Sequence, residues 1–231
     1  MVFNSLQYAL FLPVVFVIYW QLGRRNQNIL LLGASWLFYG LWDWRFLGLM
    51  WLTTAVDYLV GRYLDATEDD RKRKRAFALS LGLNLVVLGF FKYFNFFIGS
   101  AVDLFHSLGL QANEPALRIL LPVGISFYTF HCISYQVDVF RGHVKPVRTI
   151  LDFAFYVSFF PALVAGPIIR ASVFLPQMEQ PFSLTRTQFG MAVFWILNGL
   201  LKKMLIGDYI AVNFIDRVFA DPMRFTGFEN L

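Results

Sequence analysis

The feature that most constrains this chain is a succession of apolar segments, each long enough to cross a lipid bilayer as a helix. A bilayer core of about 30 Å needs about 20 apolar residues in a helix. The expected spans lie near residues 4–22, 28–44, 46–64, 76–98 and 117–140, followed by less regular segments near 150–169 and 188–206 and an amphipathic helix over 208–220. This pattern predicts an all-α polytopic membrane protein with about six to eight transmembrane or re-entrant helices, in one membrane domain over residues 1–231.

The amino-acid composition excludes a water-soluble fold. Of the 231 residues, 58% are apolar and 15% are charged, whereas an ordinary soluble domain has about 25% charged residues. Aromatic residues make up 19% of the chain, too many large apolar side chains for a soluble protein of this length to bury. The net charge of +5 would suggest nucleic acid as a partner of a soluble protein, but here the basic residues lie between apolar segments. We therefore expect a lipid bilayer and no nucleic acid.

The connections between the expected spans alternate in charge. Residues 24–25 are both arginine, residues 67–75 (TEDDRKRKR) hold five basic residues, and residues 141–148 (RGHVKPVR) hold three. The intervening connections are neutral or acidic. Because short basic loops face the cytoplasm, we expect an amino terminus outside the cytoplasmic membrane, with these three connections inside. A topology signal explains the run at 67–75, and binding to anionic lipid or a carrier protein is the alternative.

The segment 155–170, FYVSFFPALVAGPIIR, is apolar but carries residues that break helices. Pro161 and Pro167 each remove a backbone donor, and Gly166 permits a sharp change of direction. Non-helical backbone inside a membrane is tolerated only where it is buried in protein or lines a hydrated cavity. We therefore predict a re-entrant or broken helix that faces a cavity and keeps Arg170 on the cytoplasmic side. An ordinary span with a proline kink is the alternative.

A stripe of polar and aromatic residues marks the helix expected within residues 122–142, PVGISFYTFHCISYQVDVFRG. Spacings of four and three place the stripe on one helix face; its members are Gly124, Tyr128, His131, Tyr135, Asp138 and Gly142. An ionisable side chain that faces lipid costs at least about 2.5–3.5 kcal/mol near the bilayer centre. We therefore expect this face to pack against other helices or to border water.

The residue chemistry alone names no reaction. His131, Ser134 and Asp138 are not a hydrolase triad, because a rise of about 1.5 Å per residue separates His131 from Asp138 by about 10 Å along the helix, beyond the reach that a triad needs. We expect His131 to form a buried hydrogen bond, with proton transfer as the alternative. No His or Cys pair has metal-ligand spacing, and no Gly-rich phosphate loop occurs. We therefore expect no metal and no bound cofactor.

Five blocks of sequence, taken in order, resemble the membrane-bound O-acyltransferase family. They are MVFNSLQYALFLPVVFVIYW, FFKYFNFF, LPVGISFYTFHCISYQVDVFRG, SFFPALVAGPIIR and LKKMLIGDYIA. The likeness is greatest to the branch that O-acetylates bacterial alginate. A branch that transfers D-alanine to teichoic acid shares the PVGISFYTF and AGPI features.

The resemblance implies part of a ring of tilted helices around a hydrated funnel in a bacterial inner membrane. An acyl-CoA or acyl carrier thioester would approach from the cytoplasmic side as substrate. Hydroxyls of an exported polysaccharide such as alginate would receive the acyl group, with acetyl as first choice, and periplasmic acetylation partners are implied as well. The candidates to line the tunnel or cavity are Tyr128, His131, Tyr135, Asp138, Gly166, Pro167 and Arg170.

The family's catalytic histidine, preceded by a tryptophan, comes after the segments that match here. His131 does not occupy that block, so the resemblance implies that this chain holds no catalytic residue and is inactive alone. Two readings from other classes stay open. A transporter or channel component would also need polar groups and a broken helix in the membrane, and a non-catalytic scaffold of an export complex would need no histidine.

Overall fold

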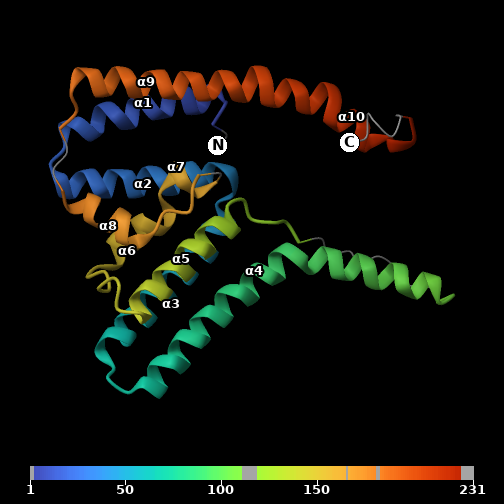
Figure 1. Cartoon of the computed structure of the whole chain (residues 1–231), viewed down its shortest axis with the longest axis horizontal. Coiled ribbons are helices and arrows are strands. Elements are labelled where there is room, and N and C mark those ends of the chain that lie inside the picture. Colours follow the sequence, from blue (N-terminus) through green and yellow to red (C-terminus); the bar gives the residue numbers. More distant parts are fainter. Residues whose placement is uncertain (1–2, 111–118, 165, 181–182, 225–231) are drawn as a thin grey trace. The chain divides into compact units, whose positions relative to one another are not determined.

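The computed structural model describes residues 3–110, 119–164, 166–180 and 183–224 (Figure 1). These residues form helices and turns and contain no strand, which confirms the all-α fold. The chain divides into two compact units, one of residues 12–180 and one of residues 2–11 with 181–231. Each unit is described by itself.

The first four helices are long. They are α1 (Leu6–Gln21), α2 (Arg24–Asp43), α3 (Arg45–Ala66) and α4 (Asp70–Ser107). Of the expected spans, 4–22, 28–44 and 46–64 each coincide with one of these helices. By length and hydropathy, α4 and the helical run Arg186–Ala220 are each sufficient to cross a membrane, and α1 is apolar but shorter. The expected total of spans stays a prediction.

The start of α4 corrects the expected loop at 67–75, because the basic run lies within the helix from Asp70 onward. The Asp69 side chain caps the helix and accepts from the backbone N–H groups of Arg71 (2.9 Å) and Lys72 (3.3 Å). Such a cap satisfies amide groups that the first helical turn leaves free. The helix also continues to Ser107, past the expected end at residue 98.

The following helices are shorter. They are α5 (Ile125–Phe140), α6 (Ile150–Ser158), α7 (Phe160–Leu163) and α8 (Ala171–Glu179). The span expected over 117–140 begins partly outside the described residues, and α5 itself starts at Ile125. Helix α8 was not predicted from the sequence. In the first unit α5 is central and contacts α3, α4, α6, α7 and α8, while α2 packs against α3, α6 and α7.

The second unit contains a long helical run. It comprises α9 (Arg186–Leu201), two stretches of π-helix (Lys202–Asp208 and Ala211–Ile215) and α10 (Asp216–Ala220), and a 3₁₀ turn follows over Pro222–Arg224. The expected segments 188–206 and 208–220 are therefore continuous. Thr185 and Gln188 form a capping box at the start, and none of the residues of α9 is buried.

Residues 150–164 and 166–179 form a hairpin, made of α6, α7, a non-helical return arm (residues 166–170) and α8. The Arg24 guanidinium donates to the carbonyls of Met178 (2.8 Å) and Gln177 at the end of α8. The start of α6 lies at the same end of α2, because Asp152 and Arg25 line one hollow. Both ends of the hairpin therefore meet the amino end of α2. The broken, returning form is confirmed, and a continuous helix with a proline kink is excluded.

The hairpin form predicts that cysteines introduced at its two ends react with a reagent applied to the same side of the membrane. Cysteines introduced as Leu151→Cys and Gln177→Cys should react with an impermeant maleimide from the same side as Arg25→Cys, because all three positions lie at one end of α2. Trp44→Cys, at the other end of α2, should react from the opposite side. The native Cys132 is 0% exposed and gives no background. Labelling of Leu151→Cys and Gln177→Cys from opposite sides would contradict the hairpin.

Candidate functional site

The start of α5 touches the hairpin because Gly124 lacks a side chain. Gly124 has a φ of +76°, in the left-handed region that favours glycine. A Cβ atom at this position would lie 2.5 Å from the backbone carbonyl oxygen of Leu163, the last residue of α7. The glycine of the PVGISFYTF block therefore permits both the turn into α5 and the close approach of α7.

His131 binds the return arm of the hairpin to α5. Its side chain is 1% exposed, and its Nε2 accepts from the backbone N–H of Ile169 at 3.2 Å. The His131 ring also packs against the Tyr156 ring in α6, with the two ring centres 5.5 Å apart. His131 thus forms the buried hydrogen bond that the sequence predicts, and it contacts both arms of the hairpin.

Two further side chains satisfy backbone groups of the hairpin. The Tyr156 hydroxyl lies 2.9 Å from the carbonyl oxygen of Ile169 and 3.3 Å from that of His131, as a donor to both. The Ser35 hydroxyl in α2 accepts from the N–H of Phe160 at 3.1 Å, where α6 gives way to α7. Side chains from α2, α5 and α6 therefore replace helical hydrogen bonds that the break removes.

The carboxyl half of the stripe on α5 packs against the connection to α6. Tyr135 is fully buried, and its hydroxyl oxygen accepts from the N–H of Val147 at 3.1 Å. The backbone carbonyl of Asp138 accepts from the N–H of His143 at 2.9 Å, and one Asp138 carboxylate oxygen lies 3.8 Å from the His143 Nδ1 atom. Four of the six stripe residues, Tyr128, His131, Tyr135 and Asp138, are buried as the sequence predicts. Gly124 is partly buried, and Gly142 at the carboxyl end of the stripe is exposed.

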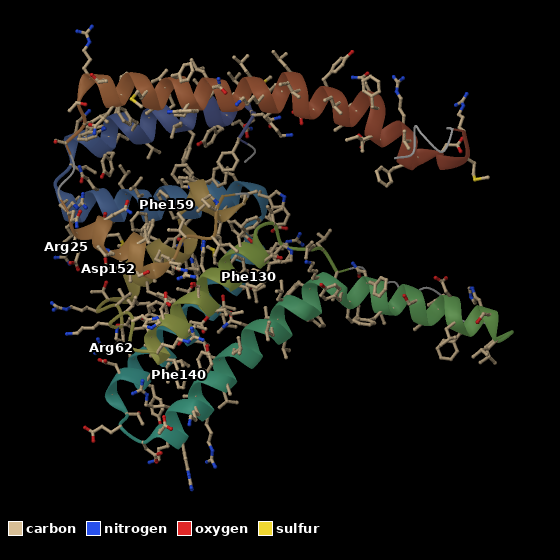
Figure 2. All side chains as sticks on the ribbon, viewed as in Figure 1. Arg25, Arg62, Phe130, Phe140, Asp152 and Phe159 are labelled. Carbon is tan, nitrogen blue, oxygen red and sulfur yellow. The ribbon has the colours of Figure 1, made fainter. Side chains whose placement is uncertain are left out.

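The structure brings together part of the predicted tunnel lining. His131 on α5 bonds Ile169, in the return arm that also contains Gly166 and Pro167. Gly166 donates from its N–H to the Ala162 carbonyl at 3.3 Å. Pro167 and Arg170 are exposed, whereas Tyr128, His131 and Tyr135 are enclosed by neighbouring side chains. That these residues line a tunnel stays a prediction. Figure 2 places Phe130, which is 43% exposed, on α5 as well.

A buried cluster around Asp57 was not predicted. Asp57 in α3 is 0% exposed. Its carboxylate accepts from Ser80 (2.5 Å) and Asn84 (2.9 and 3.0 Å) in α4. Gln136 in α5 donates to the same carboxylate at 3.2 Å and to the Asp57 carbonyl at 2.6 Å. The signal was a single aspartate within the apolar span 46–64, and only the fold shows which helices supply its donors.

A hollow of about 480 Å³ lies between the start of α4 and the end of α5. It is lined by Asp70, Arg73, Lys74, Phe140, Arg141 and Gly142. Arg73 donates to the Phe140 carbonyl at 3.1 Å, and its guanidinium lies 5.9 Å from the centre of the Phe140 ring. Lys74 pairs with Asp70 at 2.7 Å. Two of the basic connections recognised in the sequence therefore meet at this hollow.

Curated relatives match nearly the whole chain. The probable alginate O-acetylase of Pseudomonas putida is 38% identical over 231 residues, which covers 98% of this chain and 47% of the relative. The corresponding protein of Pseudomonas aeruginosa is 38% identical over 229 residues, with 98% and 44% covered. The resemblance to the membrane-bound O-acyltransferase family is confirmed.

A peptidoglycan O-acetyltransferase of Helicobacter pylori is 30% identical to this chain over 234 residues, with 87% of this chain and 43% of the relative covered. The chain spans less than half the length of the curated relatives it matches. No family model matches the chain, and no solved structure does.

The contact at Gly124 predicts a selective effect of a methyl group. Gly124→Ala should destabilise the protein by more than about 2 kcal/mol, because the strain of a positive φ adds to a clash with the Leu163 carbonyl. Gly142→Ala is the matched control: its φ is +73°, but no atom lies within 4 Å of the added Cβ. Thermal unfolding in detergent measures the difference. Equal losses for the two variants would show that α7 does not press on Gly124.

The Asp57 cluster predicts a large loss on truncation. Asp57→Ala leaves the Ser80 hydroxyl and one N–H each of Asn84 and Gln136 without an acceptor, while the bonds of these amides to backbone carbonyls remain. Each unpaired buried donor costs about 1–3 kcal/mol. We expect a loss of at least about 3 kcal/mol in the free energy of unfolding. Asp65→Ala removes an exposed carboxylate from the same helix and should change it by less than about 0.5 kcal/mol. Urea unfolding in detergent micelles compares the two, and similar small losses would contradict the role assigned to Asp57.

Proposed function

We propose that this chain forms part of a membrane O-acetyltransferase that transfers an acetyl group across the bacterial cytoplasmic membrane to hydroxyls of an exported polysaccharide such as alginate. One observation carries the proposal: 98% of the chain matches a probable alginate O-acetylase at 38% identity. The all-α fold, with its apolar helices and its hairpin held against a buried polar helix face, supports it.

His131 positions the hairpin in this proposal and does not act as the base. A base that takes the proton of an attacking hydroxyl must offer a free lone pair within hydrogen-bond reach. In neutral imidazole one nitrogen is an acceptor, and at His131 the Nε2 acceptor is already occupied by the Ile169 N–H. The proposal assigns the base to residues outside this chain, as the family resemblance implies, and expects no acyl transfer by the chain alone.

The proposed arrangement places donor and acceptor on opposite sides of the membrane. An acyl-CoA or acyl carrier thioester delivers the acetyl group from the cytoplasm, where the basic connections at 67–75 and 141–148 lie, with the amino terminus outside. Periplasmic partners receive the polymer for acetylation. The two basic connections meet at one hollow, which supports a common face for them.

Peptidoglycan is a second candidate acceptor, because one relative is a peptidoglycan O-acetyltransferase. D-alanyl transfer to teichoic acid rests only on shared sequence features, and the transporter and scaffold readings predict no ester product. The proposal favours alginate because the alginate O-acetylases match at 35–38% identity and the peptidoglycan enzyme at 30%.

Expression of the whole protein that contains this chain, in an alginate producer deleted for its own O-acetylase, tests the proposal. We expect base-labile acetate on the secreted alginate, measured by proton NMR, and none when the 231-residue chain is expressed alone. Acetate on peptidoglycan but not on alginate would reassign the acceptor. A whole protein present in the membrane without any ester product would refute acyl transfer, and acetylation by the chain alone would refute the missing base.

A further inference from the structure

A second hollow, of about 280 Å³, lies between the amino end of α2 and the start of α6. It is lined by Arg25, Asn28, Ile29, Leu32, Thr149, Leu151, Asp152 and Phe155. Figure 2 labels Arg25 and Asp152 at this end of α2. The hollow is separate from the contact between His131 and the return arm, and nothing in the proposed acyl transfer uses it.

The hollow carries one positive and one negative group that are not paired with each other. Arg24 is engaged by the end of α8, but Arg25 forms no hydrogen bond or ion pair with any residue that the structure describes. The Asp152 carboxylate accepts from the Thr149 hydroxyl at 2.6 Å and has no cationic partner within the described part of the chain. A ligand with a negative and a positive group would complement both.

The apolar lining favours an amphiphile over a small soluble zwitterion. Leu32 and Phe155 are each 4% exposed and form the buried part of the lining, whereas Ile29 and Leu151 are 49% and 48% exposed. Ile29 lies one helical turn after Arg25, at the point where α2 enters its apolar segment. Long apolar chains could therefore continue from the charged groups along this exposed surface.

We propose that this hollow binds the headgroup of a phospholipid that carries both a phosphate and an ammonium group, as phosphatidylethanolamine does. The Arg25 guanidinium binds the phosphate, a partner that its planar donors suit. The Asp152 carboxylate accepts from the ammonium group. The acyl chains lie along Ile29 and Leu151. An anionic lipid without the ammonium group, such as phosphatidylglycerol, meets the uncompensated Asp152 carboxylate and binds less well.

Lipid retention by the whole protein tests the site. The protein is purified in detergent with equal amounts of dioleoyl-phosphatidylethanolamine and dioleoyl-phosphatidylglycerol, and bound lipid is counted by native mass spectrometry. The wild type should retain the ethanolamine lipid preferentially. Arg25→Gln should lower that retention about tenfold, the worth of one charge-assisted contact. Asp152→Asn keeps an oxygen for the Thr149 hydroxyl and should remove the preference between the two lipids.

Arg71→Gln is the matched control. Arg71 is the second residue of α4, as Arg25 is of α2, and it is also exposed. It should leave retention of both lipids unchanged. Equal retention in the Arg25→Gln and Arg71→Gln proteins would overturn the site. Wild-type protein that retains phosphatidylglycerol as well as or better than phosphatidylethanolamine would overturn the role of Asp152, as would an unchanged preference in Asp152→Asn.

Discussion

The hydrogen bonding of a single buried carboxylate holds the central helices in register. A carboxylate removed from water is tolerated only when donors surround it, and those of Asp57 come from two other helices: Ser80 and Asn84 in α4, and Gln136 in α5. A hydrogen bond weakens steeply when its donor and acceptor move apart by a fraction of an ångström. These contacts therefore fix the axial and rotational positions of α3, α4 and α5 relative to one another. Apolar packing alone would permit more than one register, since Leu, Val and Phe side chains interdigitate in several ways.

Once the Gln136 face of α5 is bound to α3, the orientation of the helix determines which neighbours its other faces contact. His131 points to the hairpin, and Tyr135 meets the connection between α5 and α6. The orientation of α5 also explains why His131 suits the positioning of the hairpin better than a role as a base, because its Nε2 atom already accepts from Ile169. A lone pair that accepts from a backbone amide in a closed contact is not available to a substrate hydroxyl.

The sequence predicted features that depend on local pattern and missed those that depend on distant partners. Spacing along α5 placed Tyr128, His131 and Asp138 on a protected face, and the two prolines with Gly166 predicted the broken segment. The helical start of the basic run at Asp70 was missed because charge suggested a loop, although Asp69 was available as a cap. Helix α8 and the partners of Asp57 could not be predicted, because contacts with Arg24 and with Ser80 and Gln136 exist only after the helices meet.

The hairpin shows how an apolar helix can be interrupted while few of its backbone N–H and C=O groups are left without a hydrogen bond. Each unpaired amide or carbonyl away from water costs several kcal/mol. The break is compensated by side chains from three helices: Ser35 accepts from Phe160, His131 accepts from Ile169, and Tyr156 donates to the carbonyl of the same residue. Ile169 thus has both backbone groups bonded without belonging to a helix. The break in the hairpin therefore depends on polar residues of α2, α5 and α6 that bond its free backbone groups. The polar stripe on α5 and the broken helix are for this reason structurally linked.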